Sequence, residues 1–168
     1  EGFTDFYAGH VLLRAGLWSL SEYIDDLNRA LMRYGTSPAR NATAADVLRS
    51  FWTDQAVQKL PYDQGHLFAH LLSYRIRKAS EGRTGLHDVL RLQHTRAQRN
   101  EAEGRRIPGA TLFPAILREV TGLDIAPDLA RYGGAGQQIL LAADLFGDCF
   151  TVTTVTQPEF HRGFDVDA

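Results

Sequence analysis

Hydrophobic positions along this chain recur mostly at intervals of three and four residues, which is the spacing of one face of an α-helix. A first helix is predicted from about Thr4 to Ala15, with Gly16 as its stop. A second begins after Ser19, where Ser-Leu-Ser-Glu is a capping box, and its apolar stripe ends at Gly35. The same spacing predicts further helices at about 43–52, 62–79, 85–99, 111–120 and 128–132. Pro61 is expected to introduce the longest of them, because proline fits the first turn of a helix.

The pattern changes near the C-terminus. Residues 149–155 are rich in β-branched and aromatic side chains, and Gly147 and Pro158 lie on either side of them. This composition favours a β-strand. A strand needs a partner for its backbone hydrogen bonds, either residues 140–145 or a segment outside this chain. We therefore expect a mainly α fold, with a helical unit over residues 1–146 and a short C-terminal β strand or hairpin over 147–168.

Composition narrows the class of protein. The chain has 168 residues, of which 44% are hydrophobic and 23% charged, close to ordinary soluble usage. The single cysteine, Cys149, excludes an internal disulfide framework and a cysteine-based zinc site. The formal net charge of −2 gives no overall indication of nucleic-acid binding. No apolar run approaches the roughly 18 residues that span a bilayer.

The first eight residues carry the clearest candidate chemistry. If a helix begins near residue 1, Glu1 and Asp5 lie one turn apart on the same face, among aromatic side chains. Two such carboxylates fit a divalent metal with a histidine shell, one as a ligand and the other orienting a ligand imidazole. They equally fit an ordinary helix start, where acidic residues are favoured by the macrodipole.

This stretch, Glu-Gly-Phe-Thr-Asp-Phe-Tyr-Ala, resembles the glutamate motif of the glycyl aminopeptidase family of thermolysin-like zinc metallopeptidases. The resemblance implies that Glu1 is a zinc ligand and that Asp5 hydrogen-bonds a ligand histidine. Phe6 departs from the tyrosine that is more usual in the motif. Residues 12–34 are similar to the family's continuation after this helix.

A second motif, Leu-Pro-Tyr-Asp-Gln-Gly at residues 60–65, resembles the Tyr-x-x-Gly motif of related zinc aminopeptidases. The resemblance implies that Tyr62 donates its hydroxyl to the oxyanion of the tetrahedral intermediate. A neutral phenol suits this role, since its hydrogen bond strengthens as negative charge develops. Gln64 replaces a frequent lysine. Residues 85–90 and 112–132 match the family's helical tail, and the C-terminal strand resembles the exit toward a PDZ domain.

The sequence has no His-Glu-x-x-His motif, which in the family supplies two zinc ligands and the catalytic base. The nearest stretch runs from His66 to His70 and lacks the glutamate, so we expect one solvent-facing and one core-edge histidine there. The chain is thus expected to be the C-terminal part of a catalytic domain whose zinc helix lies upstream. Alone it should bind no zinc and hydrolyse no peptide. The resemblance further implies a peptide substrate with a small N-terminal residue and a place in the bacterial cell envelope.

Two other functions stay open. The chain is alternatively a non-catalytic helical interaction domain in which the glutamate motif is vestigial. Residues 75–106 hold nine basic and four acidic side chains, and such a surplus of positive charge is able to bind the phosphate backbone of a nucleic acid. However, this segment has no aromatic residue for base stacking, so we expect no nucleic-acid partner.

Overall fold

The computed structural model describes residues 2–156, and within them it is mainly helical, which confirms the predicted fold class. The helices are α1 (Gly2–Arg14), α2 (Leu20–Thr36), α3 (Ala44–Ser50), α4 (Gln55–Ala79), α5 (Leu86–Ala102), α6 (Gly109–Thr121) and α7 (Ala126–Asp128). A short π-helix, η1 (Leu129–Gly134), continues directly from α7.

The capping residues fix where the early helices start. Ser19 accepts a hydrogen bond from the backbone of Glu22, whose carboxylate in turn accepts one from the Ser19 backbone, so α2 begins as predicted. Thr43 and Asp46 form the same reciprocal pair at α3. Each pair satisfies backbone donors that have no partner within the helix.

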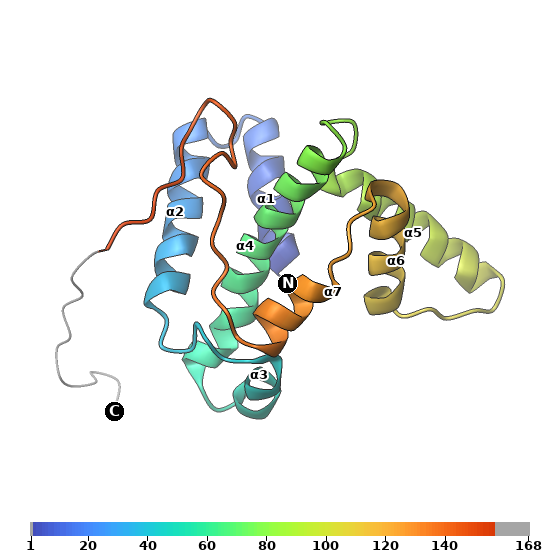
Figure 1. Ribbon diagram of the computed structural model, residues 1–168, viewed down its shortest axis with the longest axis horizontal. Helices are drawn as coiled ribbons and strands as arrows, with labels where there is room; N and C mark the ends of the chain where they lie inside the picture. The colour runs from blue at the N-terminus through green and yellow to red at the C-terminus, as the bar shows by residue number, and fades with distance from the viewer. Residues whose placement is uncertain (1, 157–168) are drawn as a thin grey trace.

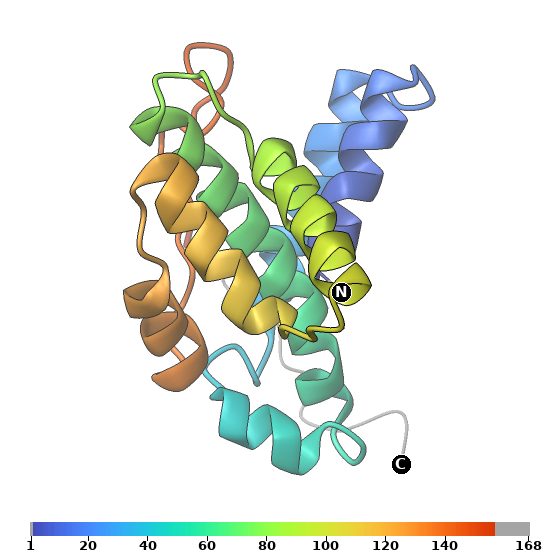
Figure 2. The same cartoon turned by 90° about the vertical axis from the view of Figure 1, so that its right-hand side faces the viewer.

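Helix α4 is the centre of the fold (Figure 1), and it packs against α1, α2, α3 and α5. In this view α2 lies on one side of α4 and the α5–α6 pair on the other, and Figure 2 shows α5 and α6 running side by side. One face of α4 joins a core with α1, α5 and α6, in which Leu72, Ile76 and Ile116 are almost wholly buried. Another face joins a second core with α2, through Leu60 and Leu67. Because α4 contributes to both cores, it sets the position of α1 relative to α2.

The predicted start of the longest helix is wrong. Helix α4 begins at Gln55, where Asp54 accepts hydrogen bonds from the backbone nitrogens of Ala56 and Val57, and it continues through Pro61. Proline costs an interior helix one backbone hydrogen bond. The N-cap and the burial of Val57 and Leu60 offset that cost, since they stabilise the turns that precede the proline.

The expected β-strand is also absent from the described part of the 147–168 segment. Residues 148–156 have no strand, and Val152 donates one backbone hydrogen bond to Ala143 at 3.0 Å. That contact does reach the predicted partner segment, 140–145, but one bond makes no ladder. β-Propensity reflects packing against neighbouring strands, and residues 2–156 contain no strand that could serve as a neighbour. Residues 157–168, which complete the predicted appendage, lie outside the described residues.

No helix within residues 2–156 combines the length and apolar character that crossing a membrane requires.

Candidate functional site

Helices α1 and α4 cross at a contact between two glycines. A Cβ atom placed on Gly2 would lie 2.3 Å from the backbone nitrogen of His66 and 2.5 Å from the Cα of Gly65. Real Cβ atoms essentially never come so close to backbone atoms. The two backbones therefore touch directly, and only glycine at position 2 permits this approach.

This crossing brings together the two motifs of the sequence. Asp5 lies on α1 one turn beyond Gly2, and Tyr62 lies on α4 one turn before Gly65. Both side chains are exposed, Tyr62 to 40%. Glu1, the predicted zinc ligand, lies outside the described residues. The structure thus places Asp5 and Tyr62 on helices that meet within one turn of each.

The turn that carries Tyr62 is fixed to α2 by an ion pair. The Arg33 guanidinium donates to Asp63 from Nη2 at 2.7 Å and from Nε at 3.1 Å, and Asp63 is buried. The hydrogen bonds that Arg33 donates to Asp63 raise the pKa of Arg33 above its ordinary value. On the same turn the Gln64 amide donates to the backbone oxygen of Tyr132, at 3.3 Å. Tyr62 therefore projects from a segment held on two sides.

His66 and His70 are both buried, so the expected solvent-facing histidine is a wrong prediction. Their Nε2 atoms lie 3.3 Å apart, at hydrogen-bond distance. Burial lowers the pKa of His70 to about 3, with the charges of His66, His10 and Arg77 adding to the effect. Burial also lowers the pKa of His66, although Asp26, Asp5 and Asp63 oppose that change. No group of three or more histidine, cysteine or carboxylate side chains among residues 2–156 is arranged to hold a metal ion.

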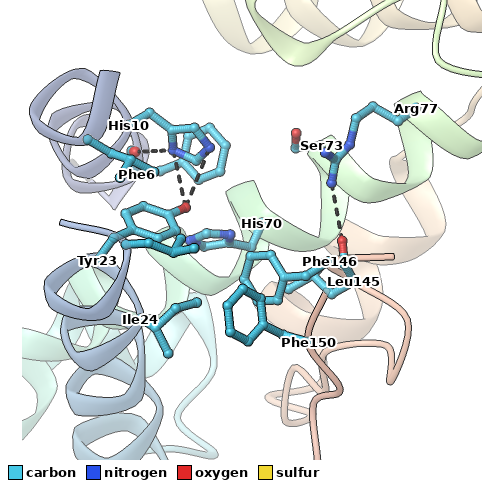
Figure 3. A pocket seen from close by; sticks show the side chains of 12 residues that line it. Phe6, His10, Tyr23, Ile24, His70, Ser73, Arg77, Leu145, Phe146 and Phe150 are labelled. Atoms are coloured by element: carbon cyan, nitrogen blue, oxygen red, sulfur yellow. Dashed lines mark hydrogen bonds between the residues drawn. The ribbon is translucent and has the colours of Figure 1, made fainter. Parts of the chain in front are cut away.

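Sequence reasoning missed the groups that surround His70. Figure 3 shows His10 of α1 and Tyr23 of α2 beside it, with Arg77 two turns further along α4. The Tyr23 hydroxyl lies 3.4 Å from Nδ1 of His10, and that nitrogen lies 2.8 Å from the backbone oxygen of Phe6. His10 falls in the periodic apolar face of the first predicted helix, and this was the only signal that it points inward.

These buried histidines predict a dependence of stability on pH. The unfolded chain binds protons near pH 6.5, whereas the folded pKa of His70 is about 3. The contribution of neutral His70 to the stability of the folded chain is therefore fully present above pH 6.5. It is lost as the pH falls from 6.5 toward 3. For one histidine the free energy of unfolding should fall by about 1.4 kcal/mol per pH unit.

Urea unfolding at several pH values measures this slope. His70→Gln should flatten it, while His94→Gln, which changes an exposed histidine on α5, should leave it unchanged. Equal slopes in both variants would contradict a role for His70.

Comparison with known protein families gives a match to the part of the chain that contains both motifs. Residues 1–74 match the M61 glycyl aminopeptidase family. This segment of the chain is therefore similar to M61 peptidases. The match contains α1, α2 and α3 and most of α4, and hence both motifs that meet at the Gly2–Gly65 contact. A comparison with curated proteins found no match.

Proposed function

We propose that this chain is the C-terminal part of the catalytic domain of a zinc-dependent aminopeptidase that removes small N-terminal residues. One observation carries the proposal. The Gly2–Gly65 contact joins the glutamate motif to the Tyr-x-x-Gly motif, and the M61 match contains both. Two motifs with separate roles in one reaction have to lie close together in space, and here their backbones touch.

The described residues do not themselves make a zinc site. They contain no suitable group of three ligands, and the sequence has no His-Glu-x-x-His motif. The proposed complete site therefore needs a segment that supplies this motif, with Glu1 as the remaining protein ligand. Zinc in such a site would lower the pKa of a bound water and polarise the substrate carbonyl.

Asp5 and Tyr62 then have separate tasks. The exposed Asp5 carboxylate is available to accept a hydrogen bond from the N–H of a ligand imidazole, which would fix the orientation of that ring. The Tyr62 phenol would donate to the carbonyl oxygen of the substrate as negative charge develops on it. The Arg33–Asp63 ion pair would position Tyr62, because it anchors the adjacent residue.

An exposed apolar surface on α1 supports the proposal that a further segment packs against this helix. It is formed by Phe3, Thr4, Tyr7, Ala8, Val11 and Leu90. Val11 is 61% exposed, and the buried Tyr7 hydroxyl has no hydrogen-bond partner among the described residues. An exposed apolar surface with an unsatisfied donor at its base is typical of a face on which another part of the protein packs.

Zinc binding tests the proposal. Below, the completed domain is this chain preceded by a segment that contains His-Glu-x-x-His. We expect one zinc per completed domain and none retained by the chain alone after dialysis, measured by elemental analysis. Asp5→Asn should weaken zinc binding by the completed domain about 10–100-fold, which is typical for a residue that orients a ligand. Asp25→Asn, an equal change at an exposed position of α2, is the matched control.

Two results would overturn the proposal. Tight zinc binding by the chain alone would mean that its own residues form a different site. Failure of the completed domain to retain zinc would favour the alternative, an interaction domain with a vestigial motif.

A further inference from the structure

A cavity of about 200 Å³ lies between α1, α2, the second half of α4 and the segment 145–150 (Figure 3). No role in the proposed peptidase function involves it. Its apolar lining includes Phe6 from α1 and Phe146 and Phe150 from the C-terminal segment. Phe146 packs edge-on against both His70 and Phe150, with ring centroids 6.4 and 6.2 Å apart. This apolar side suits an apolar group of modest size.

The other side of the cavity carries hydrogen-bonding groups. It is lined by His10, Tyr23, His70, Ser73 and Arg77. His70 is only 4% exposed, and Nε2 of its ring lies 3.3 Å from Nε2 of His66. This side of the cavity therefore offers polar groups to a ligand.

The charges around the cavity are cationic. Arg77 donates from Nη2 to the backbone oxygen of Leu145 at 3.3 Å and forms no ion pair within the described part of the chain. No carboxylate is among the lining residues. The positive charge of Arg77 adds to burial in lowering the pKa of both His10 and His70, and Arg14 acts on His10 in the same direction. Among the lining residues, Tyr23 has a pKa raised to about 12 by burial, and the charge of Asp26 adds to that effect.

We propose that this cavity binds a small monocarboxylate with an apolar body. The carboxylate would pair with the free N–H groups of Arg77, and His70 and Tyr23 would line its inner side. Arginine is suited to this because its planar fork is able to donate two parallel hydrogen bonds to one carboxylate. The apolar body would lie between Phe6, Phe146 and Phe150. A cavity of this size admits a ligand much smaller than a drug, with one short chain or ring.

The proposal does not depend on the peptidase function, and the chain as it stands is sufficient to test it. Amide chemical shifts of the isotope-labelled chain are followed while 3-phenylpropionate is added. We expect saturable shifts in residues 70–77 and 145–150. The neutral isostere 3-phenylpropionamide should bind at least about tenfold more weakly, because it cannot form the charge-assisted pair. Acetate, which lacks the ring, should also bind more weakly.

Variants locate the anion. Arg77→Gln should weaken 3-phenylpropionate binding at least about tenfold and remove the preference over the amide. Lys78→Gln removes the same charge from the next residue, which does not line the cavity, and should have little effect. Equal binding of acid and amide by the unaltered chain would overturn the proposal without any variant. So would absence of saturable binding, or an effect of Lys78→Gln as large as that of Arg77→Gln.

Discussion

Gly2→Ala is expected to lower the free energy of unfolding by about 3 kcal/mol, the upper end of the usual cost of overpacking. The added methyl group would lie 2.3 Å from the backbone nitrogen of His66 and 2.4 Å from the carbonyl carbon of Gly65. Backbone atoms within a helix cannot move aside as a flexible side chain does. Helix α1 would have to shift away from α4 or give up its first turn, and the core that α1 shares with α4, α5 and α6 would be affected.

A glycine series turns this expectation into a ranked comparison by urea unfolding. Gly65→Ala should cost less than Gly2→Ala, because its Cβ would meet the nearest atom, the Cα of Gly2, at 3.1 Å. Gly35→Ala is the matched control, since this glycine lies in the last turn of α2 with no atom within 4 Å of its Cβ position. There alanine should stabilise by up to about 1 kcal/mol through helix propensity. If Gly2→Ala behaves like Gly35→Ala, the close crossing of α1 and α4 does not exist in solution.

Tyr62→Phe is expected to lower kcat of the completed domain about 100-fold or more, the usual effect of removing one donor to an oxyanion. The substitution removes only the hydroxyl group, so the fold and zinc content should be unchanged. Because the hydrogen bond would strengthen as the oxyanion forms, the loss should appear in kcat and in kcat/KM to a similar extent.

Tyr74→Phe provides the control on the same helix. The Tyr74 hydroxyl donates to Asp144 at 2.7 Å, near the other end of α4. We expect activity within about twofold of the unaltered domain, because a surface hydrogen bond contributes little. Equal activity losses in the two variants would indicate a general effect of removing hydroxyl groups from α4, and no loss in Tyr62→Phe would remove Tyr62 from the mechanism.

Local signals in the sequence predicted much of this fold correctly. The capping box at Ser19 and Glu22 and the apolar spacing of α2 determine that helix without help from the rest of the chain. Pro61 led to a wrong prediction of where α4 begins, because its unfavourable effect on the helix is outweighed by the Asp54 cap and by burial of Val57 and Leu60. The strand predicted at 149–155 is absent for the related reason that residues 2–156 contain no strand to pair with it, which no local pattern reveals.

The site was partly predictable for the same physical reasons. The motifs singled out Asp5 and Tyr62, but only tertiary structure shows that Gly2 and Gly65 bring their helices into contact. Spacing correctly placed His66 and His70 on one face of a helix, yet whether that face is exposed depends on α1 and α2. Arg77 gave no signal at all, since an arginine near a helix end is ordinary in sequence.

Hydrolysis of an alanyl or glycyl anilide, measured for this chain alone and for the completed domain, tests the proposed peptidase function. We expect zinc-dependent release of the aniline by the completed domain, its loss in Glu1→Gln, and no activity above buffer for the chain alone. Zinc-dependent hydrolysis by the chain alone would contradict the proposed function, and so would full activity of the completed domain carrying Glu1→Gln.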